Sequence, residues 1–145
     1  MIISMYIAKP YKLTFLKFIK QYLSAEDIGS YLALSWSFVE NPSRDVNVSK
    51  REIIRLFRSA DKKTLLTDEE REVFNNLDES IEIYRGVTTK GLNAAKGLSW
   101  TLSIEKARYF ANRFKRGGYV YKAHINKEHI LAYITDRSED EIVAD

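Results

Sequence analysis

The final stretch of the sequence, DRSEDEIVAD, places two carboxylates two residues apart, at Glu139 and Glu141. Because side chains alternate along a strand, a strand here would present both on one face and Ile142 and Ala144 on the other. Like charges held side by side oppose folding. The pair therefore indicates either a solvated sheet edge or a site that cleaves a glycosidic bond. In such a site one carboxylate stabilises an oxocarbenium-like centre while the second takes a proton.

An arginine in a second stretch, IEIYRG, needs a partner of opposite charge. Alternation places Arg85 on the same strand face as Ile81 and Ile83, the face expected to point into a core. A buried guanidinium without a partner is costly. A phosphate or a carboxylate satisfies its planar fork with two hydrogen bonds. The pattern leaves open a ligand phosphate and an internal salt bridge with an acid such as Glu139.

A third stretch, GLSWTLS, carries hydroxyls at alternate positions. Ser99 and Thr101 would share one strand face, and Ser103 would cap the helix that follows. Hydroxyls on a sheet face can orient a sugar or hold a neighbouring carboxylate. The alternative is ordinary strand and cap chemistry, with Trp100 packing on the opposite face.

The first 80 residues predict helices that must carry or flank these strands. Apolar residues recur at helical spacing over 11–23, and Ser24 is placed to cap a second helix. SKRE at 49–52 and TDEE at 67–70 match the capping box and open two further helices. ENPSRDVN at 40–47 interrupts the pattern. The inward positions are Leu13, Leu16, Ile19, Leu23, Ile28, Tyr31, Leu32, Ser35, Trp36, Ile53, Ile54, Phe57, Val73, Phe74 and Leu77.

The sequence after Ser80 predicts five short strands and one helix. The strands are IEIYRG, GLSWTLS, YVYKAHI, ILAYI and EDEIVAD. The helix begins after Ser103, ends at RGG, and turns Ala107, Phe110, Ala111 and Phe114 inward. We expect an α+β protein in which a helical segment, 1–80, packs on a small and mostly antiparallel core, 81–145, as one compact unit.

Composition excludes several classes of protein. Apolar residues make up 45% and aromatic residues 12% of the 145 residues, which is enough to fill a core and argues against disorder. The absence of cysteine excludes disulfides, thiolate metal sites and a thiol nucleophile, and we expect no metal. The opening MIISMYIAKPYK lacks the features of a targeting signal, and no apolar run reaches membrane-spanning length. We expect a cytoplasmic protein with no membrane partner.

The positive charge is concentrated in the second half. Residues 1–80 hold 12 basic and 12 acidic side chains, whereas residues 81–145 hold 11 and 8, which accounts for the net charge of +3. The excess lies around KARYFANRFKR at 106–116. Such a patch suits a phosphate-bearing ligand, a nucleic acid or an acidic protein, and it also suits a solvated surface without a partner.

Taken in order, the three stretches resemble the R-S-E class of ADP-ribosyltransferases, the arginine-directed type common in bacterial toxins and phage proteins. The class is similar in its strand ending in an arginine, its serine–threonine–serine strand and its closing E-x-E strand. The stretches GLSWTLSIEKARYFANR and ILAYITDRSEDEIVAD also resemble small phage-type or prophage-type members. The segment between Arg85 and Ser99 is shorter than is usual there, and Trp100 separates Ser99 from Thr101.

The resemblance implies an NAD-dependent enzyme that moves ADP-ribose to an arginine of a target protein. Arg85 would hold an NAD phosphate, and Ser99 would position the nicotinamide ribose and Glu141. Glu141 would favour the positive charge that grows as nicotinamide leaves, and Glu139 would take a proton from the acceptor arginine. The implied catalytic residues are Glu141, Glu139, Ser99 and Arg85, and the implied NAD-binding residues are Arg85, Gly86, Ser99, Trp100, Thr101, Ser103 and Tyr109.

Three other functions stay open from the sequence. An NAD glycohydrolase would use the same residues with water as the acceptor. A degenerate transferase fold could serve as a non-catalytic binding module for a protein or nucleic acid, although nucleic acid is not the partner we expect. A ribonuclease would need His124 and His129, but a lone histidine near an apolar strand is more often structural.

Overall fold

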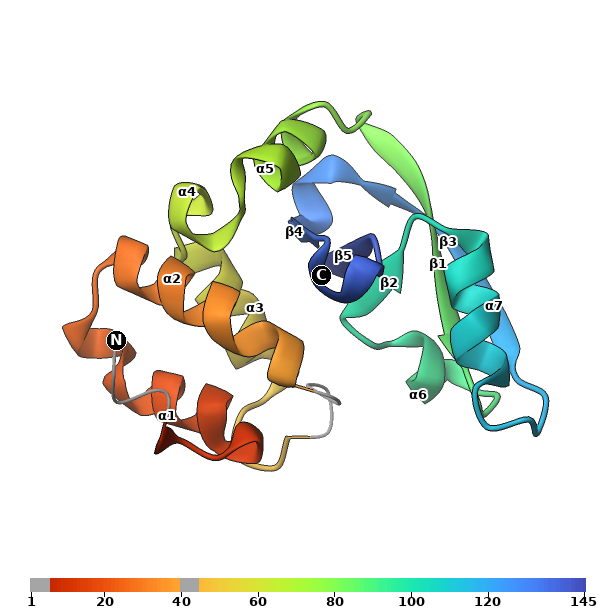
Figure 1. Cartoon of the computed structure of the whole chain (residues 1–145), viewed down its shortest axis with the longest axis horizontal. Helices are drawn as coiled ribbons and strands as arrows, with labels where there is room; N and C mark the ends of the chain where they lie inside the picture. Colours follow the sequence, from red (N-terminus) through yellow and green to blue (C-terminus); the bar gives the residue numbers. More distant parts are fainter. Residues whose placement is uncertain (1–5, 40–44) are drawn as a thin grey trace. The chain divides into compact units, whose positions relative to one another are not determined.

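The computed structural model describes residues 6–39 and 45–145 of an α+β chain that divides into two compact units, Met1–Arg71 and Glu72–Asp145. The first is helical and the second contains the sheet (Figure 1). The division falls inside α5 (Asp68–Asn75), whereas the sequence placed the boundary at residue 80. That the helical segment packs on the core stays a prediction.

The helical unit is built from α1 (Lys12–Ile19), α2 (Ala25–Ser35), α3 (Lys50–Ser59) and the short α4 (Lys62–Leu65). Single 3₁₀ turns lie at Lys9–Tyr11, Lys20–Tyr22 and Trp36–Phe38. The predicted stripe of α2 is buried, and the ring of Trp36 meets Phe57 of α3 edge to face at 4.8 Å. The α4 helix was not predicted, because four residues are too few to show a helical period.

The helix caps predicted at Ser24, Ser49 and Thr67 are all present in the structure. Ser24 and Ser49 each accept a hydrogen bond from the backbone three residues later, and Asp27 and Glu52 close the two boxes. Thr67 and Glu70 form the third box, at 2.9 and 3.2 Å. The predicted break at 40–47 lies partly outside the described residues. Val73 of α5 is exposed, so its predicted inward position is wrong.

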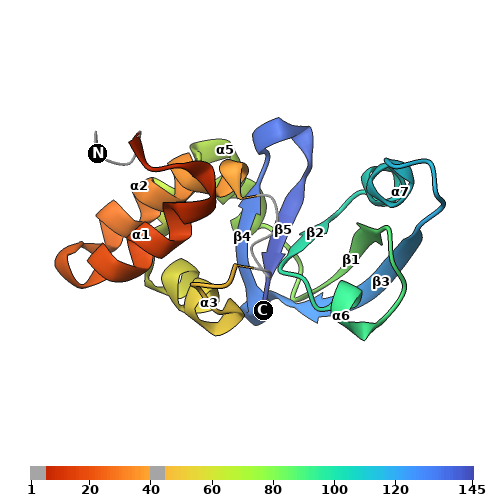
Figure 2. The same ribbon diagram turned by 90° about the horizontal axis from the view of Figure 1, so that it is seen from below.

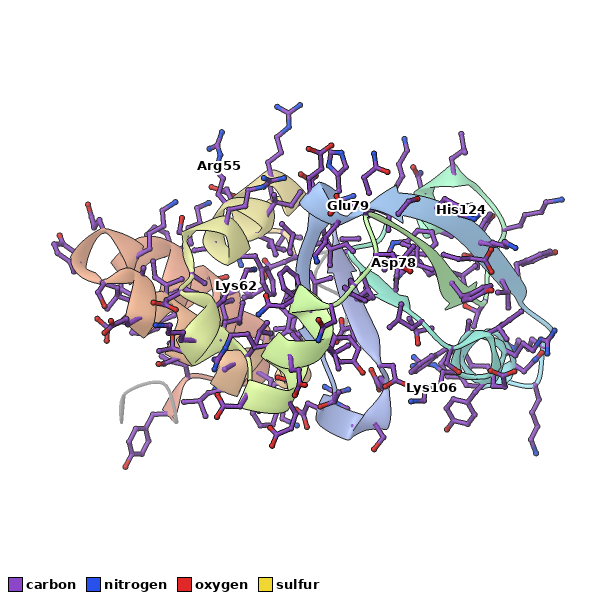
Figure 3. The ribbon with its side chains drawn as sticks, turned by 90° about the horizontal axis from the view of Figure 1, so that it is seen from above. Arg55, Lys62, Asp78, Glu79, Lys106 and His124 are labelled. Carbon is purple, nitrogen blue, oxygen red and sulfur yellow. The ribbon has the colours of Figure 1, made fainter. Side chains whose placement is uncertain are left out.

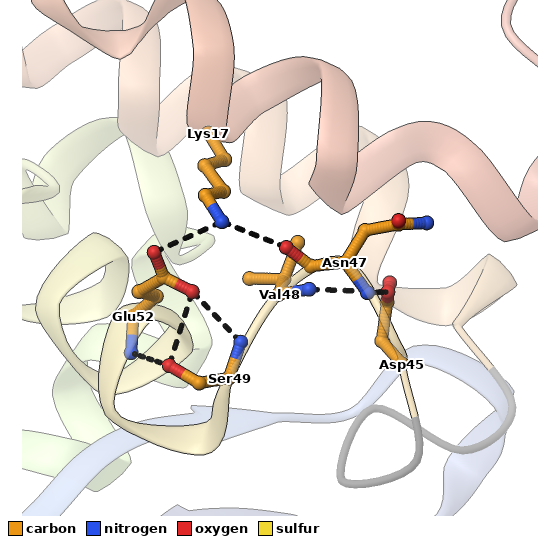
Figure 4. A network of polar contacts seen from close by, with 6 residues as sticks. All are labelled: Lys17, Asp45, Asn47, Val48, Ser49 and Glu52. Atoms are coloured by element: carbon orange, nitrogen blue, oxygen red, sulfur yellow. Dashed lines mark hydrogen bonds and ion pairs between the residues drawn. The ribbon is translucent and has the colours of Figure 1, made fainter.

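A polar network around Glu52 joins α1 to the start of α3 (Figure 4). Lys17 Nζ lies 3.1 Å from Glu52 Oε1 and donates to the Asn47 carbonyl at 2.8 Å. The other oxygen of Glu52 accepts from the Ser49 amide at 2.8 Å. Asp45 Oδ1 holds the segment before the helix by accepting from the Asn47 amide at 2.7 Å.

We expect this network to make the helical unit sensitive to acid. The Ser49 backbone amide, then Lys17 and the Ser49 hydroxyl, lower the pKa of Glu52 to about 2. A lowered folded-state pKa gives stability that is present above the ordinary value of 4.5 and is lost as the pH falls toward about 2. The E52Q variant should melt at a lower temperature at neutral pH and lose part of the dependence on pH below 5.

Far-UV circular dichroism melts at several pH values between neutral and about 2 measure this effect. Glu69→Gln, which removes an exposed carboxylate of α5, is the control and should keep the dependence of the wild type. Equal slopes of melting temperature against pH in wild type and E52Q would contradict the role given to Glu52.

The second unit is a five-stranded antiparallel sheet in the order β3-β1-β2-β5-β4. Its strands are β1 (Ser80–Val87), β2 (Ser99–Thr101), β3 (Tyr119–Asn126), β4 (Ile130–Ile134) and β5 (Glu141–Ala144). The sequence predicted all five and their mainly antiparallel pairing. One face carries a buried cluster of Ile83, Ile130, Tyr133, Ile142 and Ala144, against which Phe74 and Leu77 pack.

Helix α7 (Ile104–Asn112) covers the other face of β1, as Figure 2 shows. Ser103 caps it by accepting from the Lys106 amide at 3.3 Å, as predicted. Ala107 and Ala111 are buried as expected, but Phe114 lies beyond the helix and is 58% exposed, so that prediction is wrong. A second short helix, α6 (Leu92–Ala95), lies between β1 and β2 and was not predicted.

The close approach of α7 to β1 depends on Gly86. A Cβ placed there would lie 1.8 Å from the Ala107 carbonyl oxygen, and backbone cannot give way as a flexible side chain does. We expect Gly86→Ala to lower the free energy of unfolding of the sheet unit by about 1–3 kcal/mol or more through overpacking. Amide hydrogen exchange of β1 and β3 in native conditions measures this. Ser80→Ala, at the exposed start of β1, should leave exchange unchanged, and equal protection in the two variants would contradict the packing argument.

Candidate functional site

Ser99 connects the two charged groups that the sequence singled out. Its hydroxyl donates to Glu141 Oε1 at 2.5 Å, and its carbonyl accepts from Arg85 Nη1. The three residues come from β2, β5 and β1, which are neighbours in the sheet. The structure therefore brings a guanidinium, a hydroxyl and a carboxylate together at the start of β2.

Arg85 and Glu141 approach Ser99 from different sides of the sheet. Tyr84 pairs with Thr101, and Thr101 with Glu141, so these three side chains share one face and Arg85 starts on the other. The register of β1 with β2 consists of that one pair. Beyond this pair of residues, the Arg85 side chain reaches the backbone carbonyl of Ser99. The negative charge of Glu141 still favours the charged form of Arg85.

The segment between β1 and β2 encloses the guanidinium. Arg85 Nε donates to the Ala94 carbonyl of α6 at 2.9 Å, and a Cβ on Gly97 would lie 2.2 Å from Arg85 Cζ. Burial lowers the pKa of the Arg85 guanidinium, and the negative charge of Glu141 opposes that shift. No carboxylate of the described residues lies within 4.0 Å of Arg85, so the alternative of a salt bridge with Glu139 is not found.

Glu139 does not share a strand with Glu141. Strand β5 begins at Glu141, and Glu139 follows a 3₁₀ turn, Asp136–Ser138, in helical backbone conformation. Asp140 between the two acids has a positive φ of 45°, which breaks the alternation. The predicted pair on one strand face is therefore wrong, because the turn sends the two side chains in different directions.

Glu139 instead lines a pocket of about 530 Å³ between α7 and the turn before β5. Tyr109 and Arg113 lie on its α7 side, and Arg137 lies on its turn side. Tyr109 is 70% exposed, which leaves its ring accessible. The remaining lining residues are Glu105, Lys106, Phe110 and Ser138. Arg85, Ser99 and Glu141 do not line this pocket.

The other predicted site residues have local bonding roles. The Thr101 hydroxyl donates to the Glu139 carbonyl at 2.9 Å and accepts from the Ser103 amide at 3.1 Å. Ser103 caps α7 and lies in the loop after β2. Trp100 packs against the buried cluster, and its Nε1 donates to the Gly97 carbonyl at 2.9 Å. Thr101 thus ties the turn that carries Glu139 to β2, whereas Trp100 belongs to the core side.

Sequence reasoning missed an ion pair that fixes the acidic turn. Lys106 reaches from α7 to Asp140 at 2.5 Å (Figure 3), and the Tyr133 hydroxyl donates to the same carboxylate at 3.0 Å. The hydrogen bond from Lys106 lowers the pKa of Asp140, burial opposes the shift, and Tyr133 adds to it. Asp140 was not among the predicted site residues, because nothing in the sequence indicates its partners.

The two histidines have separate carboxylate neighbours. His124 lies on β3 (Figure 3), 3.4 Å from Glu82, which also pairs with Lys122 at 2.6 Å. His129 lies 3.4 Å from Glu128. The two histidines thus contact different acids, His124 within β3 and His129 in the 3₁₀ turn Lys127–His129 that follows it.

Within 6–39 and 45–145, no group of three or more histidine, cysteine or acidic side chains could hold a metal ion. No helix in the same two segments is long and apolar enough to span a membrane. Comparison with family models, with curated proteins and with solved structures found no match to the chain.

We expect Lys106→Met to raise the pKa of Asp140 toward its ordinary value, because the variant removes the largest stabiliser of the charged carboxylate. A carboxyl-carbon NMR titration measures this directly. Lys90→Met, which removes an exposed lysine of the same unit, serves as control. An unchanged Asp140 titration in K106M would contradict the ion pair.

Proposed function

We propose that the protein is an NAD-dependent mono-ADP-ribosyltransferase that modifies a protein arginine with release of nicotinamide. The observation that carries the proposal is the double use of Ser99, whose hydroxyl binds Glu141 while its carbonyl binds Arg85. The same three residues, in the same order along the chain, make up the motif that the sequence resembles.

Two features of the residues present support binding of a dinucleotide, although Arg85 and Glu141 start on opposite faces of the sheet. Arg85 Nη2 makes no hydrogen bond to any described residue, so the guanidinium keeps donors for a phosphate after binding Ala94 and Ser99. Its low exposure makes an added negative charge favourable. Glu141 is fixed by the Ser99 hydroxyl, which sets the direction of its carboxylate before any substrate binds.

The chemistry then assigns one task to each group. NAD supplies the glycosidic bond between nicotinamide and ribose that is cleaved. Arg85 holds a phosphate, and the Glu141 carboxylate accepts a hydrogen bond from the ribose and stabilises the positive charge that develops as that bond breaks. The resemblance assigns to Glu139 the proton of the attacking guanidinium of the acceptor; Glu139 lines the pocket beside α7, whereas Glu141 does not.

One observation favours NAD glycohydrolase as the second candidate. Arg113 and Arg137 line the same pocket as Glu139 and would repel a cationic acceptor side chain. Water carries no charge and would meet no such barrier. Nicotinamide release without label on any protein would distinguish the hydrolase from the transferase.

We expect Glu141→Gln to lower nicotinamide release by about 100-fold or more, because the amide cannot balance the developing positive charge. Ser99→Ala should give a smaller loss, since it leaves the carboxylate but not its orientation. Purified protein, NAD labelled in the adenylate, and a cell lysate supply the assay. Glu128→Gln, an exposed acid of the sheet unit, is the matched control.

The decisive outcome is labelled protein that depends on Glu141. A folded wild-type protein that neither binds NAD nor releases nicotinamide would refute the proposal. Nicotinamide release that is equal in wild type and E141Q would refute the role of Glu141.

A further inference from the structure

The outward face of α3 is a stripe of arginines. Arg51, Arg55 and Arg58 are exposed and follow one another at spacings of four and three, so they lie along one side of the helix. Arg55 points away from the helical unit (Figure 3). The opposite side of α3 is buried through Ile53, Leu56 and Phe57. We call Arg51, Arg55 and Arg58 the arginine stripe.

The acids next to α3 are already bound elsewhere. Asp45 holds the amide of Asn47, and Glu52 holds the capping box and Lys17. Asp61 accepts from the Lys63 amide at 2.7 Å. Within the described residues, the guanidinium groups of Arg51 and Arg55 form no ion pair. Residues 1–80 thus have no net charge, yet three of their arginines lie together on the exposed side of α3.

Lys62 of α4 is half buried and lies near Arg58. Burial lowers the pKa of Lys62 to about 8, and the neighbouring charge of Arg58 adds to the shift. Neighbouring like charges repel one another, and a bound polyanion would reduce that repulsion.

We propose that the arginine stripe binds the phosphate backbone of a nucleic acid. Planar guanidinium forks at one-turn spacing along a rigid helix suit a row of phosphates. A lipid surface is the less suitable polyanion, because a helix that lies on a membrane inserts an apolar face, and the apolar face of α3 is buried inside the unit. This inference is independent of the proposed enzymatic function. It also departs from the sequence-based expectation, which located the basic excess in residues 81–145.

The test measures binding of the full-length protein to a short labelled RNA and a short labelled DNA duplex of mixed sequence by fluorescence anisotropy over a range of salt. The variant R51Q/R55Q/R58Q removes the stripe. The control K20Q/K115Q/R116Q removes the same charge from exposed positions elsewhere. We expect about a tenfold or greater loss of affinity for the first variant and a salt slope reduced by about two to three, with little change for the control.

Circular dichroism checks that both triple variants remain folded. If R51Q/R55Q/R58Q does not fold, R55Q alone is the milder variant, and we expect it to show about a third of the loss of affinity. Equal losses in the two triple variants would overturn the proposal, because net charge alone would then explain binding. Absence of salt-dependent binding by the wild type would also overturn it. So would tighter binding to phosphatidylserine vesicles than to either nucleic acid.

Discussion

In the sheet unit, Ser99 of the short strand β2 connects two charged side chains from the neighbouring strands. Ser99 offers its carbonyl to a guanidinium from β1 and its hydroxyl to a carboxylate from β5. Because the two bonds use the backbone and the side chain of a single residue, any shift of β2 moves both charged partners together. The Ala94 carbonyl of α6 and the backbone at Gly97 add to this constraint, because both lie against the Arg85 guanidinium.

The turn before β5 keeps Glu139 off the strand face that carries Glu141, although the two acids are close in the sequence. Strand alternation would hold Glu139 and Glu141 side by side. The positive φ at Asp140 breaks that alternation, and Lys106 and Tyr133 hold the strained residue through its carboxylate. Thr101 fixes the Glu139 carbonyl from the adjacent strand. The turn thus separates the two acids while both remain tied to β2.

The local signals in the sequence were sufficient for the elements but not for their relations. Capping boxes and apolar periods located the helices at Ser24, Ser49 and Thr67 because such signals act within a few residues. Alternation located Arg85 on a core-facing side, yet it could not show that the side chain turns to the Ser99 carbonyl. Alternation gave the wrong strand face for Glu139, because nothing in the composition of this acidic run indicates the positive φ of Asp140. The partners of Asp140 are distant in sequence, so only the fold determines them.

Net charge misleads for a related reason. The first 80 residues are neutral by count, but the count does not say where on the surface each charge lies. Glu52 and Asp61 are bound to backbone amides at helix starts, where they satisfy groups that would otherwise lack partners. Arg51, Arg55 and Arg58 lie instead on the exposed side of α3. The total charge of a segment therefore does not show on which face its arginines lie.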